Sequence, residues 1–297
     1  MPLTPTPPRL PSVSRRTIAV LAALALLLVA AIGAATSRAA DNSSSAGSQT
    51  ESSSASGVGA EKRTSAAEKT TGSMVFTLGS HNIHWGDAQV DGFADVICWQ
   101  EATTAESRKR IRSLPGYGTS IPSDQPSQLP VSYKSDKFKL VSAGATMFHG
   151  SGPGPANPAR WMNRVLLEER TSGRLIVIYN THWVNGAWNG KPKPGYKKWR
   201  QEAWKTAEQK MNIELNEALA RDVPAFACGD FNRSTPADFD NLTPIPRGNR
   251  SGWGIDHLQY SNGSQIEAEK VFVGTNAGSD HARITSRISI PRKIMPQ

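Results

Sequence analysis

Residues 224–233 read PAFACGDFNR, an apolar run that is followed at once by Gly229, Asp230 and Asn232. A short, continuous apolar run bounded by Pro and Gly is typical of a β-strand that is buried on both faces. The polar residues then fall where the strand ends, at the edge of a sheet. This unit decides our prediction of the fold, because apolar runs that end in polar residues recur along the chain.

From residue 73 onward, many short strand-like runs are separated by few helical ones. We expect an amphipathic helix over residues 198–220 and a shorter one over 103–113. No internal repeat is visible. Many short strands with two or three helices in one block predict a single α+β domain built around packed sheets. The expected strands cover residues 74–78, 94–99, 131–134, 138–141, 164–168, 175–180, 224–228, 255–260, 270–273 and 282–290.

The first quarter of the chain differs in kind from the rest. Residues 17–35 carry no charge and follow Arg15 and Arg16. Small residues come after the run, as they do before the cleavage site of an export signal, but the run is also about long enough for a helix that spans a bilayer. We therefore expect residues 1–40 to be a signal peptide or an N-terminal membrane anchor. Either one would export the globular part of the chain, because the positive charges precede the apolar run.

Residues 41–72 consist almost wholly of Ser, Ala, Gly, Thr and scattered charges. A segment of this composition cannot bury enough apolar area to fold. We expect a disordered Ser/Ala/Gly-rich linker here, followed by a catalytic domain over residues 73–297.

The charge balance and the two cysteines add further constraints. The chain has 34 Lys and Arg against 25 Asp and Glu, a net charge of +9, and most of this excess lies after residue 73. A basic domain suits a polyanionic partner such as nucleic acid. Cys98 and Cys228 each lie in an apolar run. They could pair in an exported protein, but we expect two separate, small core residues instead.

Polar residues suited to metal binding and proton transfer follow or close the apolar runs in six places. Hard divalent cations such as Mg²⁺ prefer carboxylate and amide oxygens. Phosphoryl transfer needs a metal, a positioned water and groups that stabilise charge on the phosphate oxygens, and two His among those oxygens would supply the proton transfers. One such motif alone is usually an ordinary turn, so the six together carry the prediction. They are Asn82, Gln100-Glu101, His182, Asp230-Phe231-Asn232, Asp256-His257 and Asp280-His281.

These segments resemble the motifs of the endonuclease/exonuclease/phosphatase superfamily, the deoxyribonuclease-like metal-dependent phosphoesterases. The resemblance covers about residues 74–290, with the motifs in the order of the family. It implies a four-layer α/β/β/α sandwich of two mixed β-sheets with a cleft at one end. The matching segments are SHNIHWG (80–86), VICWQE (96–101), YNTHWV (179–184), ACGDFNR (227–233), GIDHLQYS (254–261) and SDHARI (279–284).

The resemblance also implies roles around the metal and the water. Glu101 would be the main metal ligand, supported by Asn82, and Asp280 would lie on the metal side. Asp230 would orient or deprotonate the attacking water, and Asn232 would hold a phosphate oxygen.

Two histidines complete the implied site. His281 would stabilise the phosphoryl group or transfer a proton, with Asp256 fixing its tautomer by accepting from the other ring nitrogen. His182 would be the second histidine at the scissile phosphate. Which of the two acts as acid and which as base stays open.

The chain departs from the family pattern near the metal and near the first histidine. His84 stands where some members carry an acid, so we expect the metal site to have fewer carboxylates than in the abasic-site nucleases. Residues 127–130 offer only Gln128 to orient the first histidine. Arg164, or alternatively Arg160, falls where members often place a phosphate-contacting arginine, although a surface arginine at a strand start fits equally well.

The segment after His182 interleaves aromatic and basic residues. Trp188, Lys197 and Lys198 lie in this segment, which runs over residues 188–204. Such a mixture can follow a phosphate backbone and stack on bases, although a solvated loop leading into a helix has the same composition.

We predict an exported, divalent-metal-dependent phosphodiesterase, a nuclease that hydrolyses DNA or RNA, with Mg²⁺ and with Mn²⁺ or Ca²⁺ as alternatives. We expect a monomer that is secreted or anchored to the outer face of the cytoplasmic membrane. The alternative is a phosphatase or a phospholipase-type enzyme, sphingomyelinase- or inositol-phosphatase-like, because such members share these motifs. A non-catalytic binding domain is disfavoured, because the carboxylates, the amide and the histidine of the site are all present.

Overall fold

The computed structural model describes residues 72–123, 125–154, 157–188, 196–252, 254–263 and 265–291. All of them belong to one compact unit of the chain, residues 66–297. The signal peptide or anchor expected at 1–40 and the linker expected at 41–72 lie outside the described residues, apart from Gly72. Within these ranges no helix is both long enough and apolar enough to cross a membrane.

The first of two mixed sheets has the strand order β11-β13-β1-β2-β4-β3, and β12 also pairs with β13. β1 (Met74–Asn82) and β2 (Val96–Gln100) run parallel at its centre, with Asn82 opposite Gln100 at their carboxyl ends. All other pairs in this sheet are antiparallel. The other strands are β3 (Tyr117–Ser120), β4 (Val131–Lys134), β11 (Glu267–Ala268), β12 (Phe272–Val273) and β13 (Ile284–Ile290).

The second sheet has the order β5-β6-β7-β8-β10-β9. β7 (Leu175–His182) and β8 (Ala225–Asp230) are again a parallel pair, with His182 opposite Asp230 where both strands end. β10 runs antiparallel to β8 and begins beside Asp230. The other strands are β5 (Phe138–His149), β6 (Arg160–Glu169), β9 (Leu242–Pro244) and β10 (Asp256–Ser261).

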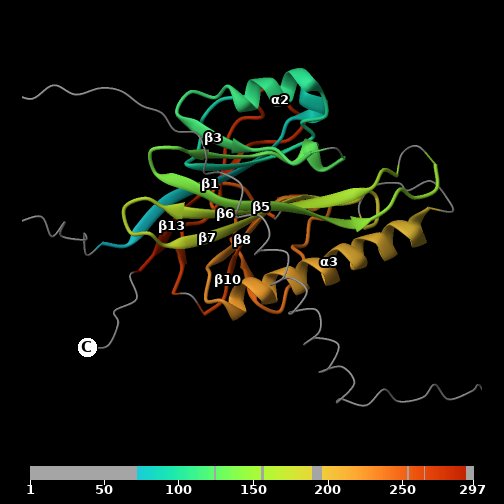
Figure 1. Cartoon of the computed structure of the whole chain (residues 1–297). Coiled ribbons are helices and arrows are strands. Elements are labelled where there is room, and N and C mark those ends of the chain that lie inside the picture. Colours follow the sequence, from blue (N-terminus) through green and yellow to red (C-terminus); the bar gives the residue numbers. More distant parts are fainter. Residues whose placement is uncertain are drawn as a thin grey trace, which may run out of the picture. The chain divides into compact units, whose positions relative to one another are not determined.

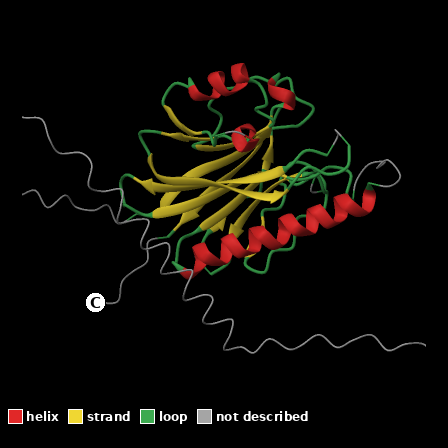
Figure 2. Ribbon diagram, turned by 45° about the vertical axis from the view of Figure 1, so that its right-hand side comes forward, coloured by secondary structure: helices red, strands yellow, loops and turns green. Residues whose placement is uncertain are grey.

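Two helices cover the outer faces of the sheets, α2 on the first sheet and α3 on the second (Figures 1 and 2). α2 (Ala105–Arg112) begins at Thr104, whose side chain accepts a hydrogen bond from the Ser107 N–H. α3 (Lys197–Ala220) confirms the expected long helix, and the side chains that it buries repeat at helical spacing. Two short 3₁₀ turns, η1 (His84–Gly86) and η2 (Gln125–Gln128), complete the elements of the described residues. The expected α/β/β/α sandwich is confirmed.

A disulfide joins the two sheets through the core. Cys98 lies in β2 and Cys228 in β8, and both are fully buried. The expectation that they are core residues is confirmed, but the expectation that they stay separate is wrong. Face-to-face packing of the sheets brings their Cα atoms to 6.4 Å, although they are 130 residues apart in sequence.

Two buried amides also tie the sheets together, just below the ends of the parallel strands. Gln100 of β2 donates from Nε2 to Oδ1 of Asn180 in β7, at 2.7 Å. The Asn180 Nδ2 group in turn donates to the carbonyl oxygens of Trp99 (2.7 Å) and Pro130 (2.9 Å). The amides of the VICWQE and YNTHWV segments therefore hold the two strand ends in register across the sandwich.

Candidate active site

The predicted polar residues meet at one end of the sandwich, because the two parallel strand pairs end there. Asn82 closes β1, and Glu101 follows β2. His182 and Asp230 are the last residues of β7 and β8, and Asp256 is the first residue of β10. The carboxyl ends of four strands thus supply most of the site.

The backbone is unusual at three positions of the site. Glu101 and Asn232 have φ of 59° and 52°, in the left-handed region, where a residue other than Gly stays only if its surroundings hold it. Gly229 has φ of +143°, and a Cβ at this position would overlap the backbone oxygen of Thr181 in β7. The Gly before Asp230 is therefore needed for the close approach of β7 and β8.

Glu101 and Asp230 form a carboxylate pair that is bridged by one amide. The Nδ2 group of Asn82 donates to Oε1 of Glu101 (3.2 Å) and to Oδ2 of Asp230 (3.1 Å). The Asn82 oxygen accepts from the His84 N–H, and the Trp85 N–H donates to Oε2 of Glu101 at 2.9 Å. Asn82 thus presents its donor rather than its oxygen to the carboxylates and holds them in place.

His182 faces this pair and is held neutral. Its Nδ1 accepts from the Arg160 guanidinium at 3.2 Å, so its Nε2 carries the hydrogen, 3.5 Å from Oδ2 of Asp230 and 3.8 Å from Oε1 of Glu101. Complete burial, and then the charges of Arg160 and His281, lower the pKa of His182 well below 6.5. A neutral imidazole that donates from Nε2 is therefore fixed beside the carboxylates.

His281 lies on the other side of Asp230 and is charged. Its Nδ1 donates to Asp256, at 2.9 Å from Oδ2, and its Nε2 lies 3.8 Å from Oδ2 of Asp230. Burial opposes the charge, but the hydrogen bond and charge of Asp256, followed by the charges of Asp230 and Asp280, outweigh it and raise the pKa of His281 to about 9. Near neutral pH this histidine presents an Nε2–H donor to the cleft.

Asp230 is the most perturbed carboxylate of the site. Burial, followed by the charge of Asp256, raises its pKa to about 7. The charge of His281, followed by the Asn232 N–H at 2.8 Å and the Asn82 amide, works against this rise. A buried carboxylate with a raised pKa is suited to accept a proton near neutral pH.

The site offers two groupings that could hold a cation. Asp230, Asp256 and His281 each offer a ligand atom, and these atoms lie within 4.8 Å of one another. Asp256 and His281 are already bonded to each other, however, and His281 would have to lose its proton to bind a metal. Glu101 and Asp230 offer carboxylate oxygens and need no histidine to lose its proton, and these oxygens are the ligands that a hard divalent cation prefers. The donor set therefore fits a cation at the Glu101 side of Asp230.

Other predicted site residues lie at the rim. Asn232 donates from Nδ2 to the Trp183 carbonyl at 3.1 Å, beside Asp230. The side chain of Asp280 is 62% exposed, and its Oδ1 lies 4.0 Å from Nε2 of His281. Trp188 is 40% exposed, and the Arg233 guanidinium lies 4.9 Å from the centre of its ring.

The structure does not bring three predicted substrate-binding residues to the cluster. Arg164 points to α3, where its Nε lies 4.0 Å from Oε2 of Glu214. Lys197 and Lys198 are exposed at the start of α3. Arg160, the alternative to Arg164, is the arginine that the site contains, because it lies four residues, about 13 Å of strand, closer to the end of the sheet.

Sequence reasoning missed one contributor, Trp85. Its backbone N–H holds Glu101, while its indole is 62% exposed. Its φ of 57° follows that of His84, at 43°. The His84-Trp85 pair inside the SHNIHWG segment is the only sequence signal that marks this turn.

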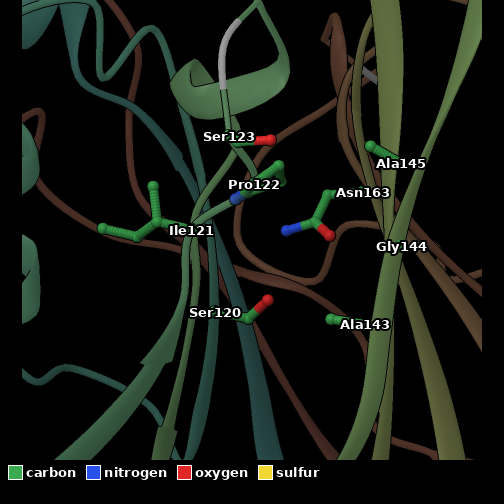
Figure 3. A pocket seen from close by; sticks show the side chains of 8 residues that line it. All are labelled: Ser120, Ile121, Pro122, Ser123, Ala143, Gly144, Ala145 and Asn163. Atoms are coloured by element: carbon green, nitrogen blue, oxygen red, sulfur yellow. The ribbon is translucent and has the colours of Figure 1, made fainter. Parts of the chain in front are cut away.

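A pocket of about 280 Å³ opens elsewhere, between the end of β3 and the middle of β5 (Figure 3). The side chain of Asn163 points into it, and Nδ2 of Asn163 donates to the Leu129 carbonyl at 2.9 Å. It has no titratable lining residue, so it offers no group for acid–base or metal chemistry. The lining residues are Ser120, Ile121, Pro122, Ser123, Ala143, Gly144, Ala145 and Asn163.

Comparison with known proteins identifies relatives of this arrangement. The sequence profile described as "Endonuclease/Exonuclease/phosphatase family" matches residues 79–281. No curated protein sequence matches the chain.

Solved structures share the fold at low sequence identity. A Bacteroides thetaiotaomicron protein of this family has a TM-score of 0.60 at 16% identity, over 77% of this chain and 99% of its own. A mannosyl-6-phosphatase from the same organism has a TM-score of 0.52 at 15% identity, over 71% of this chain and 98% of its own. ANGEL2, a 2′,3′-cyclic phosphatase, has a TM-score of 0.52 at 16% identity, over 74% of this chain and 96% of its own. At these identities the likeness shows the fold alone.

Proposed function

Because the chain belongs to the endonuclease/exonuclease/phosphatase family, we propose that it is an exported, Mg²⁺-dependent phosphodiesterase that hydrolyses DNA or RNA. Membership makes it a divalent-metal-dependent phosphoric ester hydrolase. The metal identity, the substrate and the compartment are the proposed part. One observation carries the chemistry: a buried carboxylate, Asp230, lies between a neutral histidine, His182, and a protonated one, His281.

Each side chain has a role that follows from its protonation state. Asp230, buried beside both histidines, accepts a proton from the attacking water or orients it. His281 donates from Nε2 to a phosphate oxygen or to the leaving group, with its other nitrogen held by Asp256. His182 donates from Nε2 to a second phosphate oxygen, while Arg160 fixes its tautomer. Two donors and one acceptor thus surround one phosphate.

A divalent cation, when bound, would supply positive charge that stabilises the phosphate oxygens and would acidify water. Glu101 and Asp230 are the residues that would hold it, with Asp280 as a further oxygen donor at the rim. Asn82 positions the two carboxylates. We propose Mg²⁺ because the donors are oxygens and because neither cysteine is available, both being in the disulfide.

Two observations favour an exported protein. The uncharged run at 17–35 follows two arginines. The Cys98–Cys228 disulfide suits an oxidising compartment, since the cytoplasm keeps most thiols reduced. Expression of the complete chain, followed by cell fractionation and alkaline extraction of the membranes, tests this part. Protein in the medium supports a cleaved signal, protein that stays with extracted membranes supports an anchor, and protein in the cytoplasm contradicts both.

Nucleic acid is favoured as substrate by the basic charge of the chain and by the Arg233–Trp188 contact at the rim. The alternative is a phosphatase that acts on small phosphoesters. This alternative is supported by the fold that the chain shares with a mannosyl-6-phosphatase and a 2′,3′-cyclic phosphatase. The test incubates the full chain with plasmid DNA, RNA, sphingomyelin vesicles and mannose 6-phosphate, each with Mg²⁺ and with EDTA. We expect Mg²⁺-dependent cleavage of nucleic acid, and hydrolysis of only the lipid or the sugar phosphate would overturn this substrate assignment.

A further inference from the structure

A second pocket, of about 370 Å³, adjoins the His281–Asp256 pair. It lies between the segment that joins β9 to β10 and the segment that joins β12 to β13. His281, Asp256 and Asp280 line it, but Glu101, Asp230 and His182 do not. The pocket is therefore beside the reacting centre rather than over it. Its other lining residues are Arg247, Arg250, Gly254, Ile255, Asn276 and Ala282.

Two arginines face this pocket together with the carboxylates of Asp256 and Asp280, but neither arginine forms an ion pair with them. Within the described residues, no Asp or Glu oxygen lies within 4.0 Å of either guanidinium. Arg247 donates from Nη2 to the backbone oxygen of Asp256 at 3.3 Å, while the Asp256 carboxylate is committed to His281. The pKa of Arg247 is lowered, mainly by burial. The charge of Asp256 opposes this change, and the charge of Arg250 adds to it. Two guanidiniums that line one pocket without an ion-pair partner among the described residues favour the binding of an anion.

The backbone that carries these arginines is fixed before any ligand binds. The Gly248 N–H donates to the Val271 oxygen, and the Val271 N–H to the Pro246 oxygen, both at 2.8 Å. The Asn249 side chain bonds both backbone groups of Val273, accepting at 2.8 Å and donating at 2.9 Å. These hydrogen bonds order the backbone next to Arg247 and Arg250. The entropic cost of ordering this backbone when an anion binds is therefore small.

Gly254 makes room for one of the two guanidiniums. A Cβ at this position would overlap the Arg247 guanidinium, and its φ is +61°. The Arg247 side chain therefore lies flat against the backbone that leads into Asp256. Any other residue at 254 would both strain the backbone and displace the arginine.

We propose that the pocket lined by Arg247 and Arg250 binds a second phosphate of the substrate, the one next to the phosphate that is hydrolysed. The inference rests on the proposed function and narrows it. A substrate with two neighbouring phosphates, as in a polynucleotide, binds better than one with a single phosphate. His281 then lies between the two, with Nε2 toward the scissile phosphate and with its other edge, held by Asp256, against the pocket.

The test uses dinucleotides that differ by one phosphate. The full chain with Mg²⁺ is given dTpdT, which has one phosphodiester, and the same dinucleotide with an added 5′ or 3′ phosphate. We expect one phosphorylated form to be hydrolysed with about tenfold higher kcat/KM than dTpdT, a difference of about 1.4 kcal/mol. The form that gains shows on which side of the scissile bond the pocket lies.

Arg250→Gln is the main variant, because Arg250 is exposed and its replacement leaves the fold intact. Arg112→Gln, at an exposed arginine that ends α2, is the matched control. We expect Arg250→Gln to remove the preference for the added phosphate while hydrolysis of dTpdT is unchanged, and Arg112→Gln to change neither. If Arg250→Gln and wild-type protein preferred the phosphorylated dinucleotide over dTpdT by the same factor, the proposal would be overturned.

A binding measurement separates this inference from the proposed function. Intrinsic Trp fluorescence in EDTA is used to titrate the three dinucleotides into wild-type and Arg250→Gln protein. If wild-type protein binds a phosphorylated dinucleotide more tightly than dTpdT, and Arg250→Gln protein does not, the result supports the phosphate-binding pocket. If no dinucleotide is hydrolysed in the same study, only the proposed hydrolytic activity is contradicted. Equal affinity of wild-type protein for all three dinucleotides overturns the pocket.

Discussion

Removal of the Cys98–Cys228 disulfide should lower the free energy of unfolding by about 5 kcal/mol. The bond closes a loop of 130 residues, and in the chain-entropy account a loop of that length costs about 5 kcal/mol to close. Few single changes in a domain have so large an effect. The effect falls mainly on the unfolded chain, which the bond keeps compact, so the native sheets should keep their packing.

Urea unfolding of the full chain, followed by Trp fluorescence with and without reductant, measures this difference. The double variant Cys98→Ala/Cys228→Ala is the control, because its stability should be low and should not respond to reductant. The denaturant dependence, the m-value, should rise in reduced protein as the unfolded state expands. Equal midpoints for oxidised and reduced wild type would refute the assignment of a bond between the sheets.

Three further changes test the packing and the electrostatics of the site. Gly229→Ala should destabilise the fold by about 2 kcal/mol or more, because the Cβ has no room against β7; thermal unfolding measures this, and an unchanged Tm would contradict the close strand contact. Asn180→Ala should cost about 2 kcal/mol or more in urea unfolding, because the variant loses three buried hydrogen bonds, to the Trp99 and Pro130 carbonyls and from the Gln100 amide, and stability equal to that of wild type would mean that the amide does not tie the sheets. Asp256→Asn should shift the alkaline limb of the pH–rate profile to lower pH. The His281 pKa of about 9 depends on that carboxylate, so the charged imidazole is lost at lower pH in the variant; a limb that stays in place would contradict the assigned role of the pair.

Most of the architecture was predictable because burial shows in the sequence. Strands buried on both faces, such as β8, appear as continuous apolar runs, and the long helix α3 shows its period. β5 was harder, since most of its residues are exposed and show no apolar alternation, so the prediction ended it at residue 141 rather than at His149. β3 was missed for a similar reason, because its residues are polar or half-buried.

Some features of the candidate site could also be predicted from the sequence, and others could not. Residues at strand ends, such as Glu101 and Asp230, could be located because the chain order fixes where the parallel strands finish. Contacts between distant segments could not be predicted. The disulfide depends on how the two sheets face each other, and the choice between Arg160 and Arg164 depends on how far β6 extends toward the site. Neither follows from local periodicity.

Under the proposed function, phosphodiester hydrolysis requires a divalent cation, which Glu101 and Asp230 would hold. The most direct measurement compares wild type with Glu101→Gln on bis(p-nitrophenyl) phosphate in Mg²⁺ and in EDTA, with urea unfolding as a check of the fold. We expect EDTA to abolish wild-type activity. We also expect Glu101→Gln to lower kcat/KM by at least about 100-fold, with an unfolding midpoint near that of wild type. Full Mg²⁺-dependent activity in Glu101→Gln would contradict the assignment of Glu101 as a metal ligand.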